Sequence, residues 1–137
     1  MITLAKERQN KIDSINIDFE SDNILPGLNK EDLEKLSIEN KPVMLKKSII
    51  DKNRANHPEV NPCEYNEIIG NALYNPYVIL PGGDKKPYYN FISKTGENKN
   101  AITLLQVENT NSGYLEIVNF FRINDKALRN KERKAKK

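Results

Sequence analysis

The amino-acid sequence predicts an α+β domain in which two or three N-terminal helices pack on a four-stranded antiparallel sheet. Residues 24–75 carry helix patterns with clear stop signals, whereas residues 77–123 carry four short apolar runs separated by turn-forming residues. Because helices come first and a strand meander follows, the two kinds of element are expected to form separate layers. The length of 137 residues suits one hydrophobic core.

Three helices are expected in the first part of the chain. Asn29 is suited to cap the first helix, with Glu31 and Asp32 in its first turn. The second is expected from about residue 46 to residue 56, and it should stop at His57 because a residue before proline avoids the α region. The third is expected from about residue 63 to residue 74. Its apolar residues repeat at helical spacing and predict a buried stripe of Tyr65, Ile68, Ile69, Ala72 and Leu73.

Four strands are expected in the second part, at residues 77–80, 88–93, 101–107 and 114–123. They are separated by the segments PGGDKKP, KTGENKN and ENTNSG, which are rich in turn-forming residues. Short turns between strands favour antiparallel neighbours. The segment PVML at residues 42–45 is expected to be extended but lies outside this meander.

The two ends of the chain are expected to lie outside the main domain, which would span residues 24–125. Residues 1–23 are polar, and the spacing of their few apolar residues fits neither a helix nor a strand, so they predict an arm or linker. Residues 126–137 contain seven basic residues and one acidic residue, against a net charge of −3 for residues 1–125. This basic tail has little to bury and is expected to fray. It is either a contact for a polyanion or only a solubilising end.

The composition excludes several classes of protein. No apolar stretch is long enough to span a bilayer, and no secretory signal is apparent, so a cytoplasmic protein is expected. A single cysteine, Cys63, and a single histidine, His57, exclude an internal disulfide and a structural zinc site. The glycine motifs of dinucleotide, P-loop and serine-hydrolase sites are also lacking. We therefore expect no cofactor and no metal.

A basic cluster precedes His57, and residues 46–57 carry a net charge of +3. An imidazole moves protons at neutral pH, and nearby cations stabilise the charge that grows on a phosphate during cleavage. RNA needs no metal for this reaction because its 2′-OH can serve as the nucleophile. The alternative is a solvated basic helix that His57 merely ends. The cations of the cluster are Lys46, Lys47, Lys52 and Arg54.

The predicted strands supply a second group of candidates. Tyr89 is suited to stack on a base, and Lys94 and Arg122 are suited to bind phosphate, with Asn119 beside them on the last strand. Strand alternation places only half of such residues on any one face, so some must serve packing instead. The other polar and aromatic strand residues in this group are Tyr88, Asn90, Ser93 and Thr103, whereas Tyr114, Phe120 and Phe121 are assigned to packing.

The order of these motifs resembles the phage-associated barnase/EndoU/colicin/RelE-like nucleases, the PBECR families. The resemblance covers about residues 24–130 and is carried by the pattern pV.L...I..K....HPE followed by a helix that ends in NP. Members of these families are found at the C-terminus of MuF-type phage head proteins or as small prophage-encoded proteins. The matching residues are Pro42–Leu45, Ile49, Ile50, Lys52, His57–Glu59 and Leu73–Pro76.

The resemblance implies helices followed by a four-stranded antiparallel sheet, and a metal-independent ribonuclease that leaves a 2′,3′-cyclic phosphate. It assigns Lys52 and His57 to the catalytic site, and a polar residue of the last strand would complete the site. Asn119 and Arg122 are the available residues on that strand.

We therefore expect a phage or prophage RNA endonuclease that acts as a toxin or effector. His57 would be the general acid or base and Lys52, Arg122 and Asn119 the other catalytic residues, while Lys46, Lys47, Arg54, Lys94 and Tyr89 would bind the nucleic acid. The expected partner is RNA, with an immunity protein or a phage head protein as further candidates and no membrane. The expected location is the bacterial cytoplasm or the virion. The alternative is a non-catalytic nucleic-acid-binding or structural phage head module.

Overall fold

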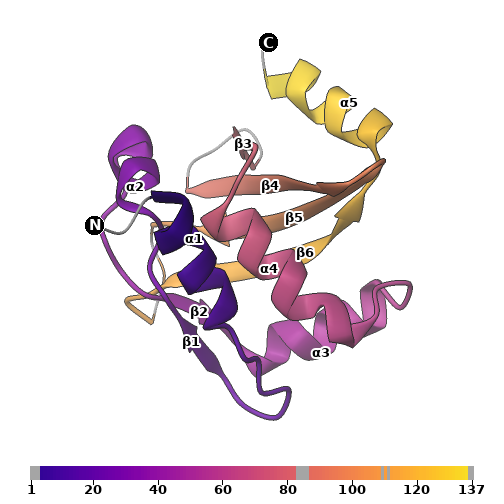
Figure 1. Cartoon of the computed structure of the whole chain (residues 1–137). Helices are drawn as coiled ribbons and strands as arrows, with labels where there is room; N and C mark the ends of the chain where they lie inside the picture. Colours follow the sequence, from indigo (N-terminus) through magenta and orange to yellow (C-terminus); the bar gives the residue numbers. More distant parts are fainter. Residues whose placement is uncertain (1–3, 83–86, 109, 111, 136–137) are drawn as a thin grey trace.

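The computed structural model describes residues 4–82, 87–108, 110 and 112–135. Its strands form one sheet in the order β1-β2-β6-β5-β4-β3 (Figure 1). The strands are β1 (Asn23–Leu25), β2 (Val43–Leu45), β3 (Val78–Pro81), β4 (Tyr88–Gly96), β5 (Lys99–Gln106) and β6 (Leu115–Ile123). The helices are α1 (Leu4–Asp13), α2 (Lys30–Leu36), α3 (Lys47–Asn56), α4 (Tyr65–Tyr74) and α5 (Asp125–Ala135), with a 3-10 turn η1 (Pro62–Glu64) before α4.

The α+β class is confirmed, but the prediction of a four-stranded antiparallel sheet is wrong. Strands β3 to β6 form the predicted antiparallel meander. Strand β2 then adds to β6 in the parallel direction, and β1 pairs antiparallel with β2, so the sheet is six-stranded and mixed. Val43 and Leu45 of β2 are fully buried. Strand β2 is therefore stabilised by burial of its two end residues, although three residues are too few to show the alternation of apolar residues that predicts a strand.

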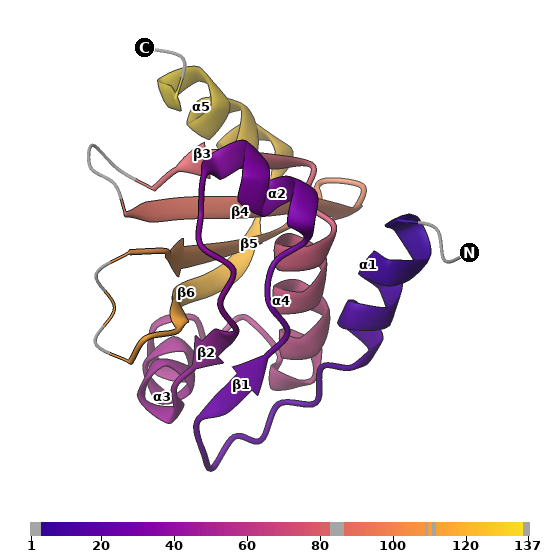
Figure 2. The ribbon, with the colours of Figure 1, turned by 90° about the vertical axis from the view of Figure 1, so that its left-hand side faces the viewer.

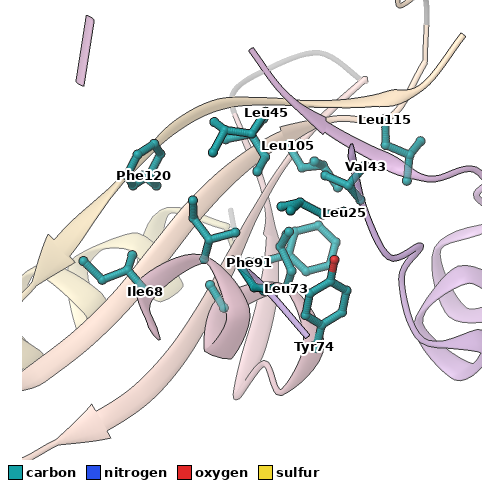
Figure 3. Packing of buried hydrophobic residues seen from close by; sticks show 14 of the residues in the cluster. Leu25, Val43, Leu45, Ile68, Leu73, Tyr74, Phe91, Leu105, Leu115 and Phe120 are labelled. Carbon is teal, nitrogen blue, oxygen red and sulfur yellow. The ribbon is translucent and has the colours of Figure 1, made fainter. Parts of the chain in front are cut away.

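The main core lies between α4 and the sheet. All five residues of the predicted α4 stripe are fully buried, which confirms that prediction. The Tyr65 ring meets the Phe120 ring of β6 edge to face, with the centroids 4.8 Å apart. Figure 3 shows side chains of α4 and of strands β4, β5 and β6 meeting in this core.

The polar N-terminal segment, which was expected to be an arm or linker, contains helix α1, and this helix packs on α4. The contact is close because Gly70 of α4 has no side chain. A Cβ atom at this position would lie 3.1 Å from both Ile12 Cγ2 and Ile15 Cδ1. Ile15, just after α1, is 6% exposed. The helix is thus held by a few apolar contacts, and a search for a repeated apolar stripe does not find it.

Helix α2 begins at the predicted N-cap, Asn29, but the Asn29 side chain does not cap it. Its amide nitrogen instead donates to the carbonyl oxygen of Tyr74 at 2.7 Å, which ties α2 to the end of α4. The Tyr74 hydroxyl donates in turn to the carbonyl oxygen of Pro26. None of the described helices is long and apolar enough to cross a membrane.

Replacing Asp32 by asparagine is expected to stabilise the protein at neutral pH. Asp32 is 8% exposed, and desolvation raises its pKa, although the charge of Arg8 and a hydrogen bond from Asn29 partly oppose this shift. A raised folded-state pKa means that stability is lost as the pH rises through the interval between the unfolded and folded pKa values. The penalty is then fully present at pH 7 and absent well below the unfolded value of about 3.9.

Thermal unfolding of the wild type and of Asp32→Asn at pH 7 and about pH 3 measures this effect. The variant should have the higher Tm at pH 7, and this advantage should disappear at the acidic pH. A lower Tm for the variant at pH 7 would mean that attraction to Arg8 outweighs desolvation of the carboxylate.

Candidate nucleic-acid interface

The two faces of the sheet are covered differently. Figure 2 shows α1 and α4 on one side of the strands, whereas α3 and α5 lie toward the other side. Phe91, Thr103 and Phe120 occupy one paired row and are fully buried on the α4 side, so their strand neighbours point the other way. On that other side, Ile92 and Ile102 are buried. Partly exposed residues there form two cross-strand rows, Asn90–Leu104–Asn119 and Tyr88–Gln106–Glu116, which we call the open face.

Helix α3 borders the open face along β6. Strand β2 pairs with β6 only at Leu115 and Glu116. Lys46, at the start of α3, contacts Glu116 at 2.9 Å, and His57, at its end, stacks on Phe121. The eleven residue steps from Lys46 to His57 cover about 16 Å along the helix, and the five from Glu116 to Phe121 cover about 17 Å along the strand. The helix and the strand therefore run side by side between these two contacts. His57 is therefore held at the border of the open face.

The His57 ring is fixed by two neighbours. It stacks on Phe121 with ring centroids 4.7 Å apart and an interplanar angle of 10°. Its Nδ1 lies 3.2 Å from Oε1 of Glu59, and its side chain is 22% exposed. The pKa of Glu59 is lowered, first by a hydrogen bond from its own backbone and then by the bond with His57. A carboxylate at Nδ1 favours the tautomer that leaves Nε2 for proton transfer.

The predicted end of α3 is confirmed. The His57 backbone N–H donates to the carbonyl oxygen of Asn53 at 2.8 Å, and the chain leaves the helix before Pro58. The rule that predicts a helix stop before proline thus also explains why His57 lies at this position.

The Arg122 side chain lies on the opposite face of β6 from Phe121, the residue on which His57 stacks. Phe121 and Arg122 are neighbours in the strand, so their side chains alternate. The Arg122 guanidinium donates to Oε1 of Glu64 at 2.9 and 3.2 Å and to Oγ1 of Thr95 at 2.8 Å. It also lies 3.6 Å from Glu67, and the side chain is 17% exposed. The hypothesis of one site shared by His57 and Arg122 does not match this placement, because Arg122 joins the η1–α4 segment to the sheet.

The predicted strand residues are divided between the two faces. Asn119 lies on the open face, and its Oδ1 accepts a hydrogen bond from the Phe120 backbone at 2.9 Å. Tyr89 packs against the main core, so the tyrosine on the open face is Tyr88. Lys94 Nζ lies 4.1 Å from the ring centroid of Tyr77. Asn119 is thus the catalytic candidate of the strands that lies on the open face, together with Tyr88 and Asn90.

Most cations of α3 already have partners. Lys46 pairs with Glu116, and Lys47 pairs with Asp51 at 2.8 Å. The Arg54 guanidinium lies over the Phe19 ring, 5.2 Å from its centroid. Lys52 is exposed and forms no ion pair within the described residues. The structure therefore leaves less free positive charge beside His57 than the sequence predicts.

The basic tail, which was expected to fray, forms α5 between residues 125 and 135. Asn124 caps this helix, because its Oδ1 accepts the Ala127 backbone N–H at 2.8 Å. Leu128 is 3% exposed and packs on Ile92 and Ile102 of the sheet. The segment is compatible with a helix by its sequence, but fraying was expected because little is apolar, although an Asn-Asp start signal and one apolar residue a turn later are present.

Two hollows in the described part of the chain lie away from the open face. These hollows, of about 650 and 460 Å³, lie beside α1 and α2 and share Lys11, Lys30 and Glu34. Lys11 Nζ donates to the carbonyl oxygens of Gly27 and Leu28, so it is already bound within the protein. No group of three or more His, Cys, Asp or Glu side chains among the described residues is arranged to hold a metal ion.

Comparison with known protein families gives a match over nearly the whole chain. The model of the family described as large polyvalent protein-associated domain 13 matches residues 7–135. No curated protein and no solved structure matches the chain. The match includes α5 and most of α1, so the family model extends over both terminal helices. The chain is a member of the large polyvalent protein-associated domain 13 family.

Proposed function

We propose that this domain binds RNA on the open face and cleaves it without a metal, through His57. The observation that carries the proposal is the fixed imidazole of His57 at the border of that face. It is stacked on Phe121 and hydrogen-bonded to Glu59. A general base needs a defined orientation and access to its substrate, and His57 combines both.

The proposed reaction is an attack of the RNA 2′-oxygen on the adjacent phosphorus. His57 Nε2 accepts the proton of the 2′-OH as the new P–O bond forms. The bond to the 5′-oxygen breaks, and this leaving oxygen takes a proton from water. The hydroxide left behind takes the proton from His57, which restores the neutral imidazole. The products are a 2′,3′-cyclic phosphate and a free 5′-OH. Lys52, exposed on the same helix, is suited to attract the phosphate.

The resemblance to the PBECR nucleases supports the same function. The segment that carries it, residues 42–76, contains β2, α3 and α4, and these elements hold His57 next to β6. On this basis we propose a phage or prophage origin, a role as a toxin or effector, and an immunity protein as a further partner.

The test is incubation of the purified protein with a defined RNA oligonucleotide in EDTA. The proposal expects fragments that end in 2′,3′-cyclic phosphate, and no cleavage of the same sequence with 2′-O-methyl groups. Uncleaved RNA under all conditions would contradict the catalytic part of the proposal.

A second candidate function is RNA binding without cleavage, and the placement of Arg122 favours it. Its guanidinium is bound to Glu64 and Thr95 and does not share a face with Phe121, on which His57 stacks. A catalytic site would then lack one of the cations that the sequence predicts. Intact RNA that is retarded on a native gel would support this function, whereas co-purification with a phage head protein and no RNA binding would support a structural role.

A further inference from the structure

Helix α5 carries a row of basic side chains on its solvent side. Lys126, Arg129 and Arg133 are exposed and lie at positions i, i+3 and i+7, which share one side of a helix. Lys134 is exposed one residue further along. We call these four residues the α5 ridge.

The α5 ridge is not neutralised by the protein. None of its four residues forms an ion pair within the described part of the chain. By contrast, two of the four cations at α3 are paired with acids. Arg129 and Arg133 also repel each other at i,i+4 spacing, which disfavours the helix unless an anion lies beside them. The free positive charge therefore gathers on α5 rather than beside His57.

Helix α5, which carries the α5 ridge, is held firmly against the sheet. Asn100 of β5 donates to Oδ1 of Asp125 at 3.0 Å and to the Ile123 carbonyl oxygen at 3.2 Å. Asn98 accepts the Asp125 backbone N–H at 2.8 Å, and Leu128 is buried on the strands. With the Asn124 cap, these contacts fix the first half of the helix.

The α5 ridge and His57 border the same side of the sheet. Phe121 packs against the cluster that contains Leu128 of α5, and the same ring stacks on His57. One aromatic ring therefore connects the two. An RNA strand that reaches His57 would have α5 as its next neighbour on this side.

We propose that the α5 ridge binds the phosphate backbone of the RNA strand whose bases or sugars lie on the open face. This proposal rests on the proposed function for the identity of the ligand. From Lys126 to Lys134 the helix rises about 12 Å. A row of cations of that length can contact several phosphates along one strand. Contacts of this kind give affinity without sequence preference and weaken with salt.

The test compares binding of a 2′-O-methyl RNA oligonucleotide, which cannot be cleaved, at several salt concentrations. The ridge variant combines Lys126→Gln, Arg129→Gln and Arg133→Gln. Each lost phosphate contact on a single strand removes about 0.7 from the slope of log affinity against log salt, so the slope should fall by about 2. Affinity at 0.1 M salt should fall roughly 100-fold for the same reason.

The matched control removes two lysines of α2 and one from the segment that follows it, with Lys30→Gln, Lys35→Gln and Lys41→Gln. Figures 1 and 2 show α2 on the opposite side of the molecule from α5. This control has the same change of net charge and should change the affinity less than threefold. Circular dichroism of both variants checks that the fold remains.

An unchanged affinity and slope in the ridge variant, or an equal loss in the control, would overturn the proposal. Binding of the ridge to phosphatidylserine vesicles with no binding to RNA would also overturn it. Cleavage is scored separately with unmodified RNA. If the wild type binds but does not cleave, and the ridge variant loses binding, the ridge proposal stands and only the catalytic proposal fails. If the wild type cleaves and the ridge variant binds as well as the wild type, the catalytic proposal stands and the ridge proposal fails.

Discussion

His57→Gln is expected to lower RNA cleavage by about 10²- to 10⁴-fold, the usual contribution of a general acid or base. Glutamine has no group that titrates near neutral pH, but its amide can still donate to Glu59 and lie on the Phe121 ring. The affinity for 2′-O-methyl RNA should therefore change little. Cleavage rates under saturating RNA, together with Kd for the uncleavable RNA, separate the loss of chemistry from a loss of binding.

The fold of this variant provides the control. The His57 side chain lies at the helix end and is partly exposed, so His57→Gln should unfold at nearly the wild-type temperature. Full cleavage activity in a folded His57→Gln protein would show that the imidazole is not the proton carrier.

Phe120→Ala is expected to destabilise the domain by about 3–5 kcal/mol, the range for truncation of a buried phenylalanine. Phe120 is fully buried in β6 and meets Tyr65 of α4, so the variant leaves a cavity where the helix contacts the sheet. Domains of this size have a total stability of about 5–15 kcal/mol, so the loss is a large share. Urea unfolding of both proteins measures it.

Tyr77→Ala is the matched control for this effect. Tyr77 is also an aromatic residue of the sheet region, but it is 53% exposed. Its removal should change stability by no more than about 0.5 kcal/mol. A loss of less than about 1 kcal/mol in Phe120→Ala would mean that the contact between α4 and β6 is not a main source of stability.

Local sequence signals predicted the elements that carry strong periodicity or a clear stop. The α4 stripe, the end of α3 at His57 and the four strands of the meander follow from spacing, from Pro58 and from turn residues. Strand β1 was not predicted, and residues 42–45 were expected to be extended but not to join the sheet as β2. Each of these strands has only three residues and depends on a partner distant in the sequence. The pairing of Val43 with Leu115 joins segments 72 residues apart.

The candidate site was predicted only in part for a similar reason. Whether a cation is free depends on its acidic partner, and such partners can lie far along the chain. Lys46 is neutralised by Glu116 and Arg122 by Glu64, and neither pair is apparent from local spacing. The basic tail forms α5, in which Leu128 is the buried residue that packs on the sheet.

The membership of the large polyvalent protein-associated domain 13 family identifies the unit but not its chemistry. The structure adds an imidazole fixed beside a partly exposed sheet face and a row of unpaired cations on α5. Both features lie on the side of the sheet that α4 does not cover. Together they lead to the proposal of an RNA strand on this side.

Nuclear magnetic resonance of the histidine ring tests this claim most directly, because His57 is the only histidine in the sequence. Its ring proton signals are therefore assigned without mutagenesis and can be followed while 2′-O-methyl RNA is added. We predict a progressive shift of these signals that saturates together with binding measured on the same sample. RNA binding that leaves the His57 signals unchanged would contradict a binding site on the open face.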